Sequence, residues 1–479
     1  MFNDLREFIS KAEEIGEYRV VEGADWDREI GAIGELVSQY PDSPLLMFDK
    51  VKGYPAGYRV ATNLATSQRR IALVYGLPPE ARGMELVKAY RDRVKEEIEP
   101  VPPVEVKTGL VKENVLVGKD VDLLKFPTPK WHELDGGRYL GTGSAGVSRD
   151  PDEGWINVGT YRAQIQDKST ITMSFTTGHH GDIIRRKYWA QGLSCPFALC
   201  CGQAPILFAT AGFDIPWGFS EYDWAGGWQK KPIEVTRGVT TDLPIPATAE
   251  IVLEGELVPP EVETRTDGPL GDTTGYYDGP QRQLPVFRVT SILHRNNPIL
   301  QGNPPSILPR VWTLGRHIQI AATLWDELDQ QLPGVKGVWS VEEATMHSIV
   351  VISLQQLYGG HAKQAAMVVA GSAAGYACDY AIVVDEDIDP SNISEVLWAL
   401  GTRSEPEEIE VVKGLRGKRA NPRLTPEQRR IGDHTHAMGI ILACKPYKWI
   451  KDFPPSIKTS PELARKVRAK WPELFPQRA

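Results

Sequence analysis

The sequence contains few cysteines and no cysteine motif. Five are present, an odd number without a C-x-x-C pair, at Cys195, Cys200, Cys201, Cys378 and Cys444. This count argues against a disulfide framework and against a cysteine-based zinc site. We therefore expect reduced, buried thiols with no chemical role.

Long apolar runs and excess positive charge are also missing. The first residues, MFNDLREF, carry charges and no apolar run, so we expect neither a secretory signal nor a transit peptide. The longest charge-free stretch, Tyr188–Phe213, is interrupted by proline and glycine and cannot form a membrane helix. With 54 Lys+Arg against 62 Asp+Glu, the net charge of −8 argues against nucleic acid as a partner. We expect a cytoplasmic protein that binds neither nucleic acid nor membranes.

A chain of 479 residues is long enough for about two to four domains. In the first part, Asn3 is placed to cap a helix with apolar positions at helical spacing, and further helices are expected near Asp27–Gln39 and Glu85–Lys95. The short apolar run Leu45–Phe48 adds a strand. A proline-rich segment at residues 99–103 precedes the first predicted boundary, and this part is expected to be an α/β domain.

The middle and last parts differ in their patterns. From about residue 115 to 310, short alternating runs predict a barrel or sandwich; the expected strands are residues 161–166 and 170–176, joined by a turn at Asp167-Lys168, and Ile206–Ala209, Ala249–Leu253 and Val286–Leu293. The last third predicts another strand-and-helix domain, with elements at Ile318–Gln331, His347–Leu354, Ala362–Cys378 and Tyr380–Val384. The basic segment Lys413–Arg430 is interpreted as a surface loop, either solvated or in contact with another subunit.

Two motifs do not support a function. Residues 141–146 match G-x-G-x-x-G, but the following Val147–Pro151 leads to a turn instead of the helix that a dinucleotide site requires. His434 and His436 lack a third metal ligand at a recognisable spacing, which favours a polar loop.

Three polar segments of the middle region carry a candidate metal site. Asn157, His180 and Glu221 together form a mixed oxygen and nitrogen ligand set that suits Mn²⁺ or Mg²⁺, especially beside a phosphate. Each also has a simpler explanation: Asn157 as a turn residue, His180 as a helix-start residue and Glu221 as a surface residue. Composition alone favours these simpler explanations.

A fourth segment carries a candidate acid–base pair. Asp267 and Asp272 flank a Gly-Pro turn that can direct both carboxylates into one cleft. With Arg162, one carboxylate would stay ionised while the other, in drier surroundings, keeps a proton to donate. A solvated turn is the alternative, because D-G-P is common turn chemistry.

These segments, in this order and spacing, resemble the UbiD-type family of reversible decarboxylases that use prenylated FMN. The shared motifs are N-x-x-x-x-R from Asn157 to Arg162, the histidine eighteen residues after that arginine, S-E-x-x-x-A-G from Ser220 and the (D/E)-G-P-x-G-(D/E) loop from Asp267. The likeness covers nearly the whole chain. It implies a mixed α/β protein with an N-terminal α/β domain (1–114), a central split β-barrel that binds the flavin (115–310) and a C-terminal α/β oligomerisation domain (311–479).

The resemblance also implies cofactors and partners. Asn157, His180 and Glu221 would ligate Mn²⁺ or Mg²⁺ against the cofactor phosphate, with K⁺ nearby. The remaining positions that line the cofactor in the family are Thr160, Tyr161, Arg162, Ser174, Phe175 and His179. A flavin prenyltransferase would supply the prenylated FMN, and the chain would assemble as a homo-oligomer, either a dimer or a hexamer.

The reaction implied is a reversible, non-oxidative decarboxylation by a carboxy-lyase. The substrate would be an aromatic, heteroaromatic or α,β-unsaturated carboxylic acid, joined covalently to the prenylated FMN before CO₂ leaves. Side chains offer no comparable electron sink. Asp272 would then protonate the carbon that lost CO₂, while Arg162 orients the carboxylate and, paired with Asp267, tunes the acid.

This sequence departs from the family pattern at two positions. The first acid is Glu in other members, so Asp267 is one methylene shorter. Some members place a Lys against the cofactor near the C-terminus, where alignment puts Met438; Lys445 is close in sequence without being clearly equivalent. Two alternatives therefore stay open: a non-catalytic flavin carrier or partner subunit, and a metal-dependent hydrolase that uses His180 and Glu221 without flavin.

Overall fold

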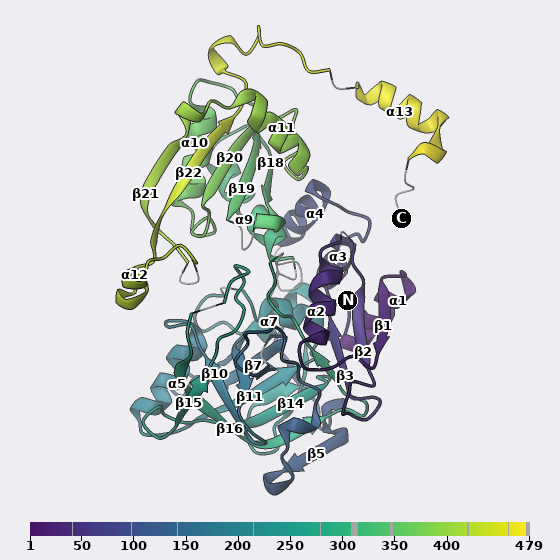
Figure 1. Cartoon of the computed structure of the whole chain (residues 1–479), viewed down its shortest axis with the longest axis vertical. Coiled ribbons are helices and arrows are strands. Elements are labelled where there is room, and N and C mark those ends of the chain that lie inside the picture. Colours follow the sequence, from purple (N-terminus) through teal and green to yellow (C-terminus); the bar gives the residue numbers. More distant parts are fainter. Residues whose placement is uncertain are drawn as a thin grey trace.

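The protein is described by a computed structural model. It covers residues 1–40, 42–96, 98–140, 142–213, 215–277, 279–307, 315–344, 348–418, 421–457 and 459–475. Figure 1 shows an elongated molecule, with the N-terminal and central parts in the lower half and the C-terminal part above them. The mixed α/β fold class expected from the sequence is confirmed.

The N-terminal domain is built on a small mixed sheet in the order β1-β2-β3-β17. Its strand β17 comes from far along the chain and pairs in parallel with β3. The elements of this domain are α1 (Leu5–Glu14), β1 (Tyr18–Glu22), α2 (Glu29–Ser38), β2 (Leu45–Asp49), β3 (Arg59–Thr62), α3 (Gln68–Tyr75), α4 (Met84–Lys95) and β17 (Ile299–Gln301). Helix α1 buries Leu5, Phe8, Ile9 and Ala12, the apolar positions expected from its sequence.

The central domain contains a ten-stranded sheet, curled as a half-barrel, in the order β6-β9-β10-β16-β14-β11-β7-β8, with β5 and β15 also paired to β16. Its strands are β5 (Asn114–Val117), β6 (Arg138–Tyr139), β7 (Ser144–Arg149), β8 (Ile156–Gly159), β9 (Arg162–Ile165), β10 (Thr170–Ser174), β11 (Cys195–Cys201), β14 (Ile251–Leu257), β15 (Thr264–Asp267) and β16 (Arg282–His294). A smaller sheet joins β4 (Val104–Glu105), β12 (Glu234–Arg237) and β13 (Pro244–Pro246). The helices are α5 (His180–Ala190), α6 (Pro205–Thr210) and α7 (Glu221–Gln229).

The C-terminal domain has a five-stranded sheet in the order β18-β19-β20-β22-β21. Its elements are α9 (Arg316–Gln331), β18 (Val335–Ser340), β19 (Ile349–Leu354), α10 (His361–Gly371), β20 (Tyr380–Asp385), α11 (Ile393–Arg403), β21 (Glu410–Arg416), α12 (Pro426–Ile431), β22 (Thr435–Ala443) and α13 (Pro461–Lys470). Helix α9 also packs against α4 of the N-terminal domain, where Arg91 Nε lies 2.6 Å from Asp326 Oδ1. This contact ties the two domains together.

Most elements expected from periodicity are confirmed, including the hairpin of β9 and β10 and the alternation of strands and helices after residue 315. The helix expected at Ala362–Cys378 is shorter than predicted, because α10 ends at Gly371. Four further predictions are wrong. The run Ile206–Ala209 is part of helix α6, not a strand; a short apolar run fits either state, and Pro205 occupies the first helical position. Residues 413–430 are not a single loop, because β21 pairs with β22 and α12 follows a capping box at Thr425.

The third wrong prediction concerns the first helix cap. Asp4, not Asn3, is the N-cap of α1, since the Asp4 carboxylate accepts a 2.8 Å hydrogen bond from the Glu7 amide. Residue His347 of the predicted run His347–Leu354 lies outside the described residues.

The cysteine prediction is confirmed: all five cysteines are free and buried. The polar loop predicted at His434 and His436, the fourth wrong prediction, is wrong for His436, which lies in strand β22, where its Nδ1 is 3.2 Å from Asp379 Oδ1. Among the described residues, no helix combines the length and apolar character needed to cross a membrane.

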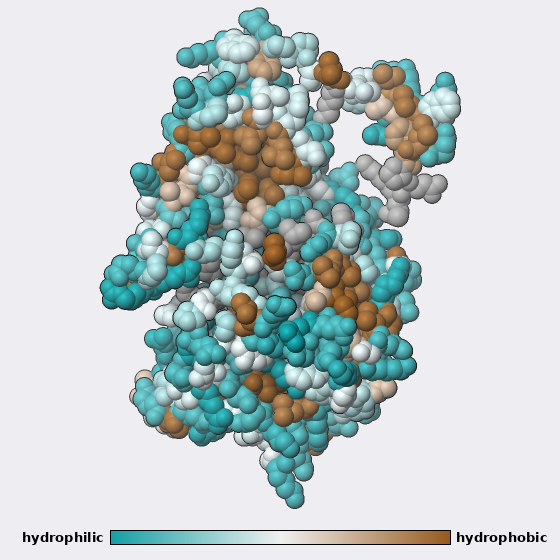
Figure 2. Space-filling view, viewed as in Figure 1, coloured by the Kyte–Doolittle hydropathy of each residue, from teal (hydrophilic) through white to brown (hydrophobic). Residues whose placement is uncertain are grey.

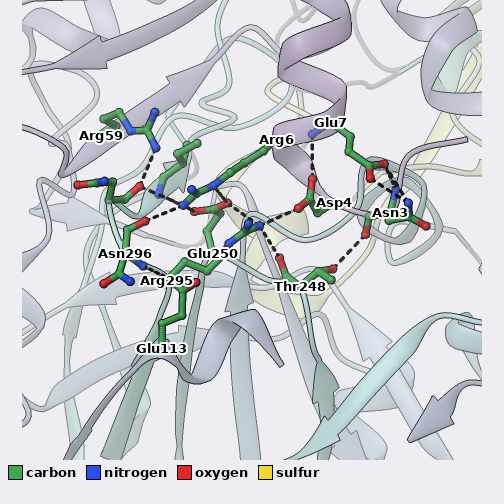
Figure 3. Close-up of polar contacts among 12 residues, drawn as sticks. Asn3, Asp4, Arg6, Glu7, Arg59, Glu113, Thr248, Glu250, Arg295 and Asn296 are labelled. Atoms are coloured by element: carbon green, nitrogen blue, oxygen red, sulfur yellow. Dashed lines mark hydrogen bonds and ion pairs between the residues drawn. The ribbon is translucent and has the colours of Figure 1, made fainter. Parts of the chain in front are cut away.

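A buried ion cluster joins the start of the chain to the central sheet (Figure 3). Glu250, fully buried beside the start of β14, accepts hydrogen bonds from Arg6 Nε at 2.7 Å and Arg6 Nη2 at 2.8 Å. Arg295 Nη1 lies 3.3 Å from the same carboxylate and 2.8 Å from Asp4 Oδ2. Two guanidinium groups and two carboxylates therefore balance one another inside the interface between α1 and the central domain.

Candidate active site

A cavity of about 260 Å³ brings polar groups of the central sheet opposite an apolar wall. The apolar wall comes from α6 and its C-terminal end, with Phe208, Ala209 and Phe213, and from Tyr75 at the end of α3. Of the residues singled out in the sequence, the cavity is lined by Thr160, Tyr161, Arg162, Ser174, His179 and Asp272. Small-molecule sites commonly have this combination of an apolar wall and a few convergent polar groups.

Arg162 and Asp267 form a buried ion pair at the edge of this cavity. Asp267, at the end of β15, is fully buried, and its Oδ1 accepts from Arg162 Nη2. Its other oxygen accepts a 2.8 Å hydrogen bond from Thr172 Oγ1. Arg162 also lies over the ring of Tyr139, with its guanidinium carbon 5.5 Å from the ring centre. These contacts fix the plane of the guanidinium, whereas Asp267 itself lies behind Arg162 and does not line the cavity.

Asp272 lines the cavity from the turn that follows the Gly-Pro pair. Its Oδ1 accepts from the Thr273 amide at 2.6 Å and from Thr273 Oγ1 at 2.8 Å. The backbone amide of Asp272 donates to the carbonyl of Tyr276 at 2.7 Å and closes the turn. The two acids therefore have different surroundings: Asp267 is held against a cation, and Asp272 is presented to the cavity.

The three candidate metal ligands come from elements that pack together. Asn157 lies on β8, and both α5, which begins at His180, and α7, which begins at Glu221, pack against that strand. Glu221 Oε2 accepts a 2.6 Å hydrogen bond from the Val158 amide, next to Asn157. The Asn157 amide nitrogen donates to the Tyr161 hydroxyl at 3.0 Å, which leaves the amide carbonyl oxygen as an acceptor.

Glu221 is an acid in surroundings that disfavour its charge. It is 3 % exposed, and burial raises the pKa of its carboxyl to about 8, although the hydrogen bond from Val158 opposes this shift. Such a group is stabilised as a carboxylate by a nearby cation. Among the described residues, no three His, Cys, Asp or Glu side chains gather as a metal site. A metal at this position would therefore depend on the Asn157 carbonyl and on oxygens of a ligand.

The His180 ring packs against two tryptophans whose rings also contact each other, with centroids 5.0 Å apart. The histidine ring meets that of Trp155 edge-on at 5.6 Å and that of Trp217 edge-on at 5.2 Å. Of the remaining predicted cofactor residues, Phe175 does not line the cavity; its ring packs 4.2 Å from the ring of Tyr161. The Tyr161 ring lies close to Gly181, where an added Cβ would come within 2.1 Å of the hydroxyl. Glycine at position 181 therefore lets helix α5 pack closely against strand β8.

Sequence reasoning missed several cavity residues. Thr142 and Ser144 belong to the G-x-G-x-x-G segment that does not qualify as a dinucleotide motif. The chain continues there as strand β7 instead of a helix, in agreement with that conclusion. Both residues nevertheless line the cavity. Arg282 follows the acidic turn and donates to Ser174 Oγ at 3.3 Å. The sequence feature that could have indicated Arg282 as a site residue is its place fifteen residues after Asp267. Arg316 lines the cavity from the first turn of α9.

The C-terminal domain supplies no cofactor lysine at the two positions considered. Met438 is fully buried in β22, and Lys445 Nζ lies 3.2 Å from Asp387. A different lysine, Lys418, donates to Ser348 Oγ at 3.0 Å. Burial lowers the pKa of Lys418 to about 8, and the charges of Asp379 and Asp272 oppose that shift. Lys418 is therefore a lysine of this domain whose charge interacts with that of Asp272.

With the fold and cavity described, comparison with known proteins places the chain in a family. The chain belongs to the UbiD family: three models match in order, namely the 3-octaprenyl-4-hydroxybenzoate carboxy-lyase N-terminal domain (residues 9–90), its Rift-related domain (103–307) and its C-terminal domain (315–441). Members of this family are carboxy-lyases, so the family and enzyme class expected from the sequence are confirmed.

Among its relatives, the chain is 34 % identical to a pyrrole-2-carboxylic acid decarboxylase of Pseudomonas aeruginosa, over 84 % of this chain and 83 % of the relative. It is 31 % identical to a phenolic acid decarboxylase of Bacillus subtilis, over 86 % and 87 % of the two chains. Among solved structures, the UbiD-class enzyme HmfF from Pelotomaculum thermopropionicum in complex with FMN superposes with a TM-score of 0.84 at 28 % identity, over 98 % of this chain and all of the other.

Proposed function

We propose that the chain is a reversible decarboxylase of an aromatic, heteroaromatic or α,β-unsaturated carboxylic acid and that it uses prenylated FMN. The observation that carries this proposal is the arrangement of Arg162 and Asp272 on one cavity, with Asp267 buried behind the arginine. A solved form of HmfF binds prenylated FMN, at 27 % identity to this chain and a TM-score of 0.79, over 97 % of this chain and 98 % of the other.

Two observations indicate that the cavity can accommodate a flavin. Ser144 Oγ is buried on the cavity wall and, among the described residues, has no hydrogen-bond partner. A bound ligand rich in carbonyl and hydroxyl groups would satisfy it. Thr160, Tyr161, Ser174 and His179 provide further polar and backbone groups around the same space.

The donor atoms of the three candidate metal ligands suit a divalent cation. Asn157 and Glu221 offer oxygen and His180 offers nitrogen, a set suited to Mn²⁺ or Mg²⁺ together with phosphate oxygens. The buried Glu221 carboxyl is the strongest support, because a cation beside it would offset the cost of its ionisation. We further propose K⁺ beside this metal, on the family resemblance alone.

The proposed reaction replaces a carboxylate with a proton. Arg162 lines the cavity and binds the substrate carboxylate, and its ion pair with Asp267 fixes the plane of the guanidinium, which orients the bond that breaks. When bound, the prenylated flavin supplies the electron sink that stabilises the carbon left by CO₂. The Asp272 carboxyl then gives its proton to that carbon, so that one proton replaces one CO₂. The apolar wall of Phe208 and Phe213 limits water at this step.

The direct test is cofactor loading followed by a substrate screen. The chain is co-expressed with a flavin prenyltransferase, purified without light or oxygen, and examined by UV–visible spectroscopy and mass analysis of the released cofactor. We expect prenylated FMN with stoichiometric Mn²⁺, and CO₂ release from planar aromatic acids. Protein that cannot be loaded, or that hydrolyses substrates with metal alone, would contradict the proposal.

The Glu221→Gln variant tests the proposed metal site. Gln keeps the size and the hydrogen bond from Val158 but removes the negative charge, so we expect Mn²⁺ affinity to fall by about 100-fold. Metal content after dialysis measures this effect. The matched control is Asp223→Gln, two residues along the same helix, where we expect unchanged metal content. Equal Mn²⁺ retention in the Glu221 variant would remove Glu221 from the ligand set.

The remaining expectations stay proposals. We propose domain boundaries near residues 114 and 310 and assembly as a homo-oligomer, either a dimer or a hexamer; an evolved form of HmfF is dimeric. We propose a cytoplasmic location, which is supported by five free, buried cysteines suited to a reducing compartment. A flavin prenyltransferase is the proposed supplier of the cofactor.

A further inference from the structure

A short turn leads to both candidate histidines of the site. Residues 176–179 join β10 to α5 and are exposed, and His180 is the first residue of α5. Gly178 in this turn has a φ of +84°, in the left-handed region that favours glycine. Because an exposed turn gains little from packing, its position depends on its hydrogen bonds.

The side chain of Asp182 holds this turn from within the first turn of α5. Asp182 is 1 % exposed, and its Oδ2 accepts a 3.2 Å hydrogen bond from the Gly178 amide. The His179 amide donates to the Thr176 carbonyl at 3.2 Å, and the Ile183 amide donates to the His179 carbonyl at 3.0 Å. Of these three hydrogen bonds, the one from Gly178 is made to a side chain, so a substitution at position 182 can remove it.

The same carboxylate fixes the guanidinium group of Arg185. Asp182 Oδ1 accepts from Arg185 Nη2 at 2.6 Å and from Arg185 Nε at 3.0 Å. Arg185 is 7 % exposed, and its guanidinium carbon lies 4.3 Å from the ring centre of Phe175 and 4.6 Å from that of Trp189. A desolvated cation over an aromatic ring is attracted by it. Asp182 therefore sets the place of the guanidinium beside these two rings.

The contacts of Phe175 continue to a candidate metal ligand. The Phe175 and Tyr161 rings lie 4.2 Å apart between their centres. The Tyr161 hydroxyl in turn accepts a 3.0 Å hydrogen bond from the amide nitrogen of Asn157. One line of contacts thus leads from Arg185 through two aromatic rings to the Asn157 side chain.

We propose that Asp182 is a positioning residue, which places three groups of the candidate site by two routes. Through the turn it sets His179 on the cavity wall and His180 at the start of α5. Through Arg185 and the aromatic rings it supports Asn157. This inference rests on the proposed function, because the metal and the flavin give the placement its purpose.

Stability alone does not explain a charged pair at this place. Taking two charges out of water is costly, and apolar side chains of similar size often stabilise a protein as well or better. Figure 1 places α5 at the left of the central domain, where Figure 2 shows a mainly hydrophilic surface. On this outer side Arg186 Nε lies 3.0 Å from Asp182 Oδ2, but the Arg186 side chain is 58 % exposed, and exposed pairs contribute little. The buried contacts of Asp182 with Gly178 and Arg185 therefore carry the placement.

The test compares two double variants that both lack the buried charges. The leucine double variant is Asp182→Leu with Arg185→Met, and the asparagine double variant is Asp182→Asn with Arg185→Met. Asn keeps an oxygen that can accept from the Gly178 amide, whereas Leu does not. Replacing the pair as a whole leaves no uncompensated buried charge, so we expect both variants to fold with urea midpoints close to that of the wild type.

Amide hydrogen exchange of the metal-free protein measures how firmly the turn is held. Mass spectrometry follows peptides that cover residues 176–180. We expect these amides to exchange about tenfold or more faster in the leucine double variant, because a hydrogen bond to a charged group is lost, and within about threefold of the wild type in the asparagine double variant. The matched control is Arg186→Met, which removes the exposed partner of Asp182 and should leave exchange unchanged.

The affinity for Mn²⁺ shows whether this placement matters to the site. Mn²⁺ is titrated into protein that contains FMN, and electron paramagnetic resonance measures the free Mn²⁺. We expect the dissociation constant to rise by about 10–100-fold in the leucine double variant, less in the asparagine double variant and not at all in Arg186→Met. A role in stability alone would affect the two double variants equally.

The outcomes separate this proposal from the proposed function. Wild-type exchange in the leucine double variant would overturn the proposal, and so would equally fast exchange in both double variants. Unchanged Mn²⁺ affinity in the leucine double variant would show that Asp182 does not position the metal ligands. If the wild type binds no Mn²⁺ in the presence of FMN, the proposed metal site fails, whereas exchange in the metal-free protein still decides whether Asp182 holds the turn.

Discussion

The Asp272→Asn variant is expected to lose about two to four orders of magnitude in the rate of CO₂ release, the usual contribution of a positioned general acid. Asn has the same shape and can keep the two hydrogen bonds from Thr273, but it has no acidic proton to give to the carbon that loses CO₂. Single-turnover decarboxylation by loaded enzyme measures the effect. Because Asp272 presents its carboxyl to the cavity, we expect flavin content and metal content to remain normal.

A second readout separates proton donation from a purely structural effect. In the reverse sense, the same carboxylate removes the proton from the decarboxylated product, so the variant should also stop exchange of the product hydrogen at that carbon with deuterium from solvent. The matched variant Asp267→Asn weakens the hold on Arg162 and should impair substrate binding as well as rate. Normal turnover by Asp272→Asn would remove Asp272 as the acid. Absence of both turnover and exchange in the loaded wild type would instead favour the non-catalytic subunit.

The Glu250→Gln variant is expected to lose about 3–5 kcal/mol of unfolding free energy, the range found when one partner of a buried ion pair is removed. Gln leaves the guanidinium groups of Arg6 and Arg295 with Asp4 as their nearest carboxylate in the cluster (Figure 3). The value should fall at the lower end of this range, because the Arg6 side chain is 33 % exposed and can recover solvation. Urea denaturation of flavin-free protein avoids the stabilisation that a ligand would add.

The control for this variant is Glu256→Gln on strand β14, whose first residue follows Glu250. Glu256 is half-buried and forms no ion pair with another described residue, so we expect a change within about 0.5 kcal/mol. A similar urea midpoint for wild type and Glu250→Gln would show that the cluster contributes no net stability. If the variant lowers the stability of only the first unfolding step, the ion cluster stabilises the interface between α1 and the central domain.

The sequence predicted the parts of the fold that depend on local periodicity. The hairpin of β9 and β10 followed from strict alternation and a turn at Asp167, and α1 followed from apolar positions at helical spacing, of which four are buried in the helix. Prediction was wrong where periodicity carries no information. The run Ile206–Ala209 is apolar throughout and is buried on all sides, so only its tertiary surroundings make it helix α6.

The candidate site was predictable to the extent that its chemistry is concentrated in short motifs. Arg162 and Asp272 could be singled out because charged groups in apolar surroundings indicate function. Phe213 and Arg316 could not, because their contribution depends on how the end of α6 and the start of α9 meet over the central sheet. Such contacts join segments about a hundred residues apart and leave no local pattern.

Strand β17 has a practical consequence for anyone who rebuilds this protein from parts. Because β17, at residues 299–301, pairs with β3, the N-terminal sheet is complete only after the chain has passed through the entire central domain. A fragment that stops at residue 114 would expose an unpaired strand edge, and a chimera that exchanges only the first hundred residues would combine β3 of one parent with β17 of another. Exchangeable blocks must therefore carry both segments, and during synthesis on the ribosome this sheet can close only after about three hundred residues have emerged.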